Sequence, residues 1–190
     1  MKHDIRRLTL AADTLLKTTT NPRHRQILSN YRRHAMLEVS GRYKEIFTPE
    51  MTVEDPFYRI NSADGLLELH GSEAVQGFYQ SLIDSQSTVM LLEHENIIVN
   101  DWGFASEALF HSFIPAETAI MNGHEVPDKN ANYIESRWVC MMWPYDEAGR
   151  MIGERVYQAP TASLEKCHEE DFITLDQVRS VFDPILAKCC

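Results

Sequence analysis

The chain has 190 residues, of which 44% are hydrophobic, and its 18 Lys and Arg stand against 28 Asp and Glu, which gives a formal net charge of −10. This composition is typical of a globular chain that can bury a core, and the length predicts one domain, alone or with appended helices. The acidic balance argues against nucleic acid as a partner, because phosphates need a basic face, and equally against an anionic membrane surface.

Several other classes are excluded by what the sequence lacks. No run of about 18 apolar residues occurs, so no transmembrane helix is expected. The N-terminal stretch MKHDIRRLTLAADTLLK has no continuous apolar core of the kind found in signal peptides, so we expect a cytoplasmic protein. The four cysteines show no C-x-x-C spacing and the eight histidines form no H-x-H or H-x-x-x-H pair, so no metal site is predicted.

Helices are expected at the start of the chain. Residues 5–16 place apolar side chains at helical spacing and predict a helix that packs on the body of the protein or on a partner subunit. Asn21 followed by Pro22 is a helix-start signal, and the predicted helix is broken at Gly41. A short helix over residues 43–47 follows and ends before Pro49.

The next stretch, TVEDPF (52–57), predicts a short strand. Because Pro56 has no N–H group to donate, we place this strand at a sheet edge. Residues 60–70 are expected to form a loop or a short hairpin. Ser72 is the expected cap of a third helix, whose apolar residues follow at helical spacing from Val75.

The second half of the chain is rich in strand patterns. A polar loop separates two pairs of expected strands, which span residues 91–100, 103–114, 132–145 and 151–158. Thr174 and Gln177 resemble a capping box that opens a final helix. The order of elements predicts the α+β class: a cone-shaped, curved antiparallel sheet packed on N-terminal helices, with extra helices at both ends and an apolar pocket inside.

Three segments are characteristic in combination: TVEDPF (52–57), HGSEAVQGFYQSL (70–82) and YDEAGRMIGERVY (145–157). They resemble the nuclear-transport-factor-2-like (NTF2-like) superfamily, and within it the ketosteroid isomerases and the SnoaL-like polyketide cyclases. The resemblance covers residues 22–160, which it marks as an NTF2-like catalytic domain. Residues 1–21 are then an N-terminal helix and linker, and residues 161–190 are a C-terminal helical extension.

The resemblance implies roles for three residues. In the isomerases, the Asp of the EDP sequence is the general base, and that residue here is Asp55. A Tyr that precedes the base by 24 residues donates a hydrogen bond to the developing oxyanion, and Tyr31 has this spacing. A further Tyr in the third helix supports that donor and matches Tyr79. These enzymes use no cofactor, so none is expected.

The sequence departs from the resemblance in two places. Counting back from Gly149, the position of the acidic residue that donates the second hydrogen bond to the oxyanion is occupied by Met141, and a thioether cannot donate. The segment 58–69 is longer than expected for the isomerases and should lie near the pocket mouth. Both departures argue against authentic steroid isomerisation and for a different hydrophobic substrate.

Alternation of side chains along a strand assigns faces to the candidates. Asp55 shares its face with Phe57, so Glu54 points to solvent if Asp55 points into the pocket. Likewise, if Met141 faces the pocket, so do Arg137 and Trp143. The expected substrate-binding residues are Phe57, Tyr58, Tyr79, Glu107, Arg137, Met141 and Trp143.

One register of the strand over residues 103–114 places Glu107 and His111 inside the pocket. Two interpretations follow from it. In the first, Glu107 forms an ion pair with Arg137, because a buried charge needs a partner. In the second, His111 replaces the missing acid as a hydrogen-bond donor, or acts as a second acid/base.

The opposite face of the same sheet carries Trp138, Cys140 and Met142. Apolar residues on this face predict a homodimer or a larger homo-oligomer, since in this superfamily the outer face often buries against a second subunit. The alternative is that the closing helix, over residues 175–185, covers them.

These inferences predict a cofactor-independent enzyme that acts on a small hydrophobic or aromatic substrate. Asp55 and Tyr31, with His111 as a further candidate, would abstract or transfer a proton on an aryl or polycyclic ring, in an isomerase or a lyase/dehydratase reaction. Two other functions remain open. The chain could be a non-catalytic ligand-binding module of the same fold, or the structural small subunit of an aromatic-ring dioxygenase.

Overall fold

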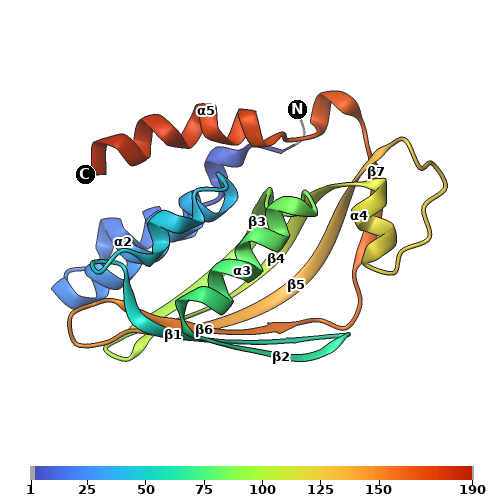
Figure 1. The fold of residues 1–190 in the computed structure, drawn as a ribbon. Helices are drawn as coiled ribbons and strands as arrows, with labels where there is room; N and C mark the ends of the chain where they lie inside the picture. Colours follow the sequence, from blue (N-terminus) through green and yellow to red (C-terminus); the bar gives the residue numbers. More distant parts are fainter. Residues whose placement is uncertain (1–2, 190) are drawn as a thin grey trace.

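One long, curved sheet organises the chain (Figure 1). In the computed structural model, which describes residues 3–189, the strands follow the order β2-β1-β6-β5-β4-β3, and β7 pairs with β5. The strands are β1 (Thr52–Ser62), β2 (Gly65–His70), β3 (Met90–Asn100), β4 (Gly103–Pro115), β5 (Asn132–Pro144), β6 (Met151–Gln158) and β7 (Ser163–Cys167). Residues 1, 2 and 190 of the predicted terminal segments lie outside the described residues.

Helices α2 (Pro22–Val39) and α3 (Gly71–Asp84) cover the concave side of the sheet. The other helices of the chain are η1 (Ile5–Arg7), α1 (Leu10–Thr18), η2 (Tyr43–Phe47), α4 (Ala116–Met121), η3 (Glu169–Asp171), α5 (Leu175–Leu186) and η4 (Ala187–Cys189). Helix α2 contacts β3 and β4, α3 contacts β1 and β2, and α5 packs on α2 on the side away from the sheet (Figure 1). Among these helices, none is long and apolar enough to cross a lipid bilayer.

The helix starts read from the sequence are confirmed. The Asn21 side chain accepts hydrogen bonds from the backbone N–H groups of Arg23 and His24, which satisfies two of the donors that a helix start leaves free. Thr174 and Gln177 form a complete capping box at the start of α5. These short-range bonds fix where two of the main helices begin.

The predicted α+β class is confirmed, but β1 does not lie at the edge of the sheet. It pairs with β2 on one side and runs parallel to β6 on the other, so the sheet is mixed and the edge position belongs to β2. Pro56 is tolerated inside the sheet because the pairing with β6 is interrupted between Thr52 and Phe57.

Three smaller elements differ from expectation. Helix α4 lies within the predicted polar loop, and β7 was not predicted. Helix α3 begins at Gly71, with His70 at the N-cap position, so Ser72 is not its cap. The Ser72 hydroxyl instead donates to the backbone oxygen of Glu54, 3.0 Å away, and ties the helix start to β1.

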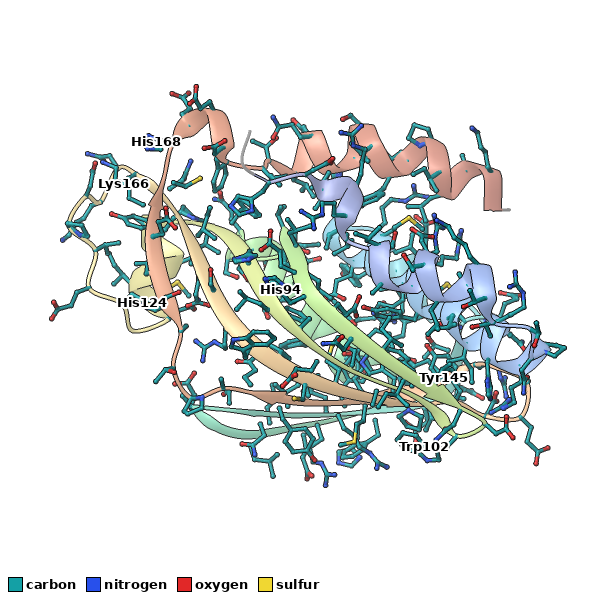
Figure 2. The ribbon with its side chains drawn as sticks, turned by 180° about the vertical axis from the view of Figure 1, so that it is seen from behind. His94, Trp102, His124, Tyr145, Lys166 and His168 are labelled. Carbon is teal, nitrogen blue, oxygen red and sulfur yellow. The ribbon has the colours of Figure 1, made fainter. Side chains whose placement is uncertain are left out.

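The outer face of the sheet keeps large apolar side chains exposed. Ile98 is 73% exposed and Trp138 is 44% exposed. Helix α5 packs on α2 and does not cover Trp138, so the expectation that the closing helix covers this face is wrong for Trp138. Seen from behind in Figure 2, His94 lies on β3 and Trp102 at the turn into β4.

The contact between β1 and β6 requires glycine at position 153. A Cβ atom at Gly153 would lie 1.8 Å from the Phe57 carbonyl oxygen, which is backbone and cannot rotate away. We expect Gly153→Ala to lower the free energy of unfolding by about 1–3 kcal/mol through overpacking. Urea unfolding followed by tryptophan fluorescence measures this loss.

Gly77→Ala is the matched control, because nothing lies within 4 Å of its Cβ position in α3. Alanine at a helical position should leave stability unchanged or raise it by up to about 1 kcal/mol. Equal stabilities of the two variants would contradict the close strand contact.

Candidate functional site

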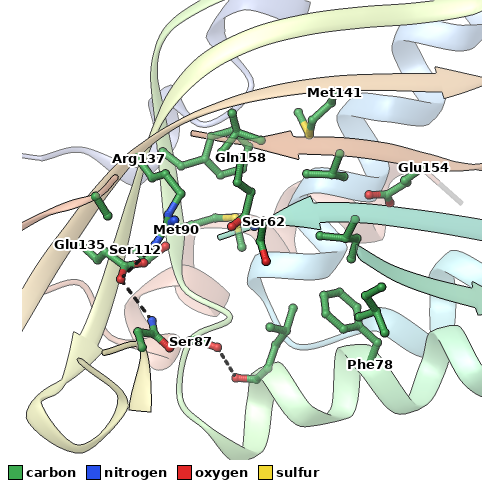
Figure 3. Close-up of a pocket in the computed structure, with 18 of the residues that line it drawn as sticks. Ser62, Phe78, Ser87, Met90, Ser112, Glu135, Arg137, Met141, Glu154 and Gln158 are labelled. Carbon is green, nitrogen blue, oxygen red and sulfur yellow. Dashed lines mark hydrogen bonds and ion pairs between the residues drawn. The ribbon is translucent and has the colours of Figure 1, made fainter. Parts of the chain in front are cut away.

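The concave face of the sheet and helices α2 and α3 enclose one large cavity of about 770 Å³. This volume is within the range of small-molecule binding sites, which are mostly apolar with a few polar groups. The apolar part of the lining includes Ile60, Phe78, Leu92, Phe110, Met141 and Val156. Figure 3 shows Glu154 at one end of the cavity and Glu135 and Arg137 at the other, with Ser62 and Gln158 between them.

The inner end is built around Glu154, which β6 carries into the cavity and which is 7% exposed. Three elements supply its neighbours. The Tyr79 hydroxyl, from α3, donates to Glu154 Oε1 at 3.0 Å and lies 3.1 Å from the Tyr58 hydroxyl of β1. His34 Nε2, from α2, lies 2.9 Å from the Tyr79 hydroxyl and 3.4 Å from Glu154 Oε1.

Burial determines the charge of this acid. It raises the pKa of the Glu154 carboxyl well above its usual range, and the negative charge of nearby Glu38 raises it further. Hydrogen bonds from Tyr58 and Tyr79 act in the opposite direction but are weaker than the burial. Glu154 is therefore neutral at a pH at which ordinary carboxyls are ionised, and a neutral carboxyl can donate a proton.

Tyr31 lines the same cavity, and its hydroxyl donates to Glu95 Oε1. Burial raises the pKa of the Glu95 carboxyl to about 7, against the lowering effect of the hydrogen bond from Tyr31. Glu95 also lines a separate groove between α1 and β3. Tyr31 thus lies between the cavity and Glu95, a titratable residue that also lines the groove under α1.

The second end of the cavity lies under the segment that follows α4. Glu135 and Arg137 come from β5, and Asn122 and His124 come from the segment. His124 Nε2 lies 2.6 Å from Glu135 Oε1, and Asn122 Nδ2 donates to the same oxygen at 3.3 Å. These bonds hold the segment against the sheet and close this end.

The structure corrects the expected orientation of Asp55. Its side chain is exposed and is not part of the cavity lining. The physical reason is the interrupted pairing between Thr52 and Phe57, which shifts the alternation of β1 so that Tyr58 and Ile60, rather than Asp55, are buried. Phe57 also lies outside the lining and packs against His70.

The expected register of β4 is wrong as well. Arg137 lines the cavity, and its partner across the strands is Phe110, so the even-numbered residues of β4 face inward. His111 therefore faces away, where its Nδ1 lies 2.7 Å from the Ser136 hydroxyl. Glu107 is exposed on the outer face and forms no ion pair with Arg137, which lies 3.7 Å from Glu135.

Several other predicted residues do lie in the cavity wall. Arg137, Met141 and Trp143 all line the cavity, as alternation along β5 required, and so does Tyr79. Tyr58, which was expected to contact the substrate, is not part of the lining: it is fully buried behind it, with its hydroxyl against that of Tyr79.

The sequence analysis missed the two polar ends of the cavity. Glu154 lies in the segment YDEAGRMIGERVY, where it shares a strand face with Val156, and an acid between inward apolar residues was a usable signal. His34 lies one helical turn after Tyr31 and carried a similar signal. The partners of Glu135 could not be found, because His124 comes from a segment without a periodic pattern.

The fold can now be compared with known proteins. No family model and no curated protein matches the sequence. A candidate polyketide cyclase from Xanthomonas campestris pv. campestris is 15% identical over 71% of this chain and 91% of its own, with a TM-score of 0.52. A candidate SnoaL-like polyketide cyclase from Jannaschia sp. CCS1 is 12% identical over 74% and 90%, with a TM-score of 0.54.

An NTF2-like protein from Anabaena variabilis is 12% identical over 76% of this chain and 95% of its own, with a TM-score of 0.52. Identities this low show the fold alone. The predicted resemblance is confirmed at that level: the chain has the NTF2-like fold, with the SnoaL-like proteins among its structural neighbours.

The raised pKa of the Glu95 carboxyl, which contacts Tyr31, can be tested by the pH dependence of stability. Its pKa of about 7 in the folded chain exceeds the ordinary value of 4.5, so the folded state holds this proton longer than the unfolded state. Its contribution to stability is therefore fully present below pH 4.5 and is lost as pH rises to about 7. We expect Glu95→Gln to become more stable relative to the wild type across this interval.

Urea unfolding at several pH values from 4.5 to 8 measures the difference. Glu107→Gln, which removes an exposed carboxylate of the outer face, is the control and should follow the wild-type profile. A constant difference between Glu95→Gln and wild type at every pH would contradict the raised pKa.

Proposed function

We propose that the protein is a cofactor-independent enzyme that transfers a proton on a hydrophobic ring substrate, aryl or polycyclic, with isomerisation or elimination as the outcome. The observation that carries this proposal is the buried carboxyl of Glu154 in the wall of an apolar cavity, where burial raises its pKa. Carboxyls with a raised pKa in apolar clefts are the groups that enzymes use as general acids and bases.

Glu154 takes the catalytic role that the sequence assigned to Asp55. The neutral carboxyl donates its proton to one substrate atom, and the carboxylate that remains accepts a proton from a neighbouring atom, which regenerates the acid. If the first proton goes to carbon, the net reaction is isomerisation. If it goes to a hydroxyl that leaves as water, the net reaction is elimination.

Tyr31 keeps its predicted role as donor to a developing oxyanion in this proposal. Tyr31 lines the cavity, and its hydroxyl donates to Glu95 in the structure. Protonated Glu95 can donate to the Tyr31 oxygen instead, which releases the Tyr31 hydrogen for the substrate. A donor of this kind is worth about two to three orders of magnitude in turnover.

The test is a spectrophotometric assay with a 5-ene-3-ketosteroid, in which conjugation of the enone gives an ultraviolet signal, followed by a screen of oxygenated aryl compounds. We expect Glu154→Gln to reduce turnover of any substrate found by about 10²–10⁴-fold, since the amide cannot exchange a proton in this way. Asp55→Asn is the matched control, because Asp55 is exposed outside the cavity, and its turnover should equal that of wild type.

Full activity of Glu154→Gln would reject the proposal, as would the loss of activity in Asp55→Asn alone. Binding of these compounds without conversion by the wild type would favour the other candidate, a ligand-binding module. A role as dioxygenase small subunit would require co-purification with a larger iron-containing chain.

We also propose that the outer face of the sheet joins two copies of the chain. Trp138 of β5 and Tyr157 of β6 are exposed on neighbouring strands of this face, and Ile98 is exposed on β3, two strands beyond β5. Exposed apolar surface of this kind often marks a protein–protein interface. We expect wild type to be a dimer in size-exclusion chromatography with light scattering, and Trp138→Glu to be a monomer.

Met121→Glu is the control for this experiment, because Met121 is 70% exposed but lies at the end of α4, away from the outer face. It should leave the dimer intact. A monomeric wild type, or a dimeric Trp138→Glu, would contradict the proposed interface.

A further inference from the structure

The end of the cavity remote from Glu154 has an arrangement that the proton transfer does not use. Glu135 is 8% exposed and accepts from Asn122 and His124, while Arg137 stands beside it on the same strand face. All four residues line the cavity (Figure 3 shows the two from β5). Burying a charged carboxyl costs desolvation free energy, which its partners offset only in part, so such an arrangement suggests a role in ligand binding.

The contacts to Glu135 leave one oxygen available. His124, Asn122 and Arg137 all approach Oε1, at 2.6, 3.3 and 3.7 Å. Among the described residues, Oε2 has no hydrogen-bond partner. The site therefore presents one carboxylate oxygen as an acceptor.

Arg137 supplies donors next to that acceptor. Its Nη1 donates to the backbone oxygen of Ala159 at 3.1 Å, and its Nη2 lies beyond hydrogen-bond distance of Glu135. A guanidinium has five N–H groups, so most of them remain available to a ligand. An acceptor and a donor thus face the cavity side by side, on two residues of opposite charge.

The chemistry of this pair selects one kind of group. A carboxylate or phosphate would be repelled by Glu135, and an ammonium group would be repelled by Arg137. A hydroxyl fits both, because it donates to Glu135 and accepts from Arg137. Resting on the proposed function, we infer that this end of the cavity binds a hydroxyl group of the substrate.

The spacing of the two ends then describes the substrate. Arg137 and Trp143 are six residues apart on β5, which is about 20 Å at roughly 3.3 Å per residue. Met141 pairs with Val156, so Glu154, two residues further along β6, lies at the Trp143 end. The side chains at both ends shorten this span. The substrate is therefore an elongated, polycyclic alcohol or phenol whose hydroxyl lies at the end remote from the reacting atoms.

The test uses testosterone and its 17-deoxy analogue, androst-4-en-3-one, which differ by one hydroxyl at the end remote from the ketone. Isothermal titration calorimetry gives the Kd of each. We expect wild type to bind testosterone at least about tenfold more tightly, as for a hydrogen bond to a charged group. Arg137→Met and Glu135→Gln should each reduce this ratio towards one and leave the Kd of the deoxy compound nearly unchanged.

Arg155→Met is the matched control, because Arg155 lies over the Trp102 ring and is not part of the cavity lining; it should keep the wild-type ratio. Equal affinities for the two compounds in wild type would overturn the inference. So would a full ratio in both Arg137→Met and Glu135→Gln, or a wild type that binds neither compound.

The same measurement separates this inference from the proposed function. Glu154→Gln acts at the other end and should keep the ratio while it loses turnover. If Glu154→Gln keeps its turnover and Arg137→Met loses the ratio, the hydroxyl site stands and the proposed function fails. If Glu154→Gln loses turnover and Arg137→Met keeps the ratio, the reverse holds.

Discussion

The burial of one carboxyl determines how the inner part of this protein is built. Glu154 can stay buried inside the cavity because the Tyr79 hydroxyl satisfies one of its oxygens, and Tyr79 is in turn held by Tyr58 and His34. These residues come from β6, α3, β1 and α2, so the network ties the sheet to both helices that cover it. A shift of any one element would leave a polar atom without its partner, which is costly in an apolar interior.

The cavity combines this inner network with a different one at its far end. Near Glu154 the groups share protons, whereas Glu135 and Arg137 are opposite charges fixed on a strand. The apolar middle, with Met141 and Phe110, separates the two. A molecule that fills the cavity therefore contacts the proton-transfer group at one end and is held in position at the other. A reaction at a single position of a large ring system needs both.

Features that depend on residues close together in the sequence were predicted correctly, and features that depend on pairing between distant strands were not. Asn21 and Thr174 cap helices through bonds to residues two or three positions away, so short motifs revealed them. The faces of β5 were assigned correctly because alternation fixes the face of every residue in a regular strand once the face of one residue, here Met141, is known. The faces of β1 and β4 were assigned incorrectly. In β1, the interrupted pairing with β6 turns Asp55 away from the cavity. In β4, the face of His111 depends on the register with β5, and no local sequence pattern specifies that register.

Glu95 gives the N-terminal helix a place in the chemistry. It touches Tyr31 on the cavity side and lines the groove beneath α1 on the other. A carboxyl with a pKa of about 7 therefore lies between the cavity and a second groove, on the opposite side of Tyr31 from the ligand-sized space. Helix α1 forms one wall of that groove, so a segment outside the region of family resemblance determines how the far side of the Tyr31–Glu95 pair is covered.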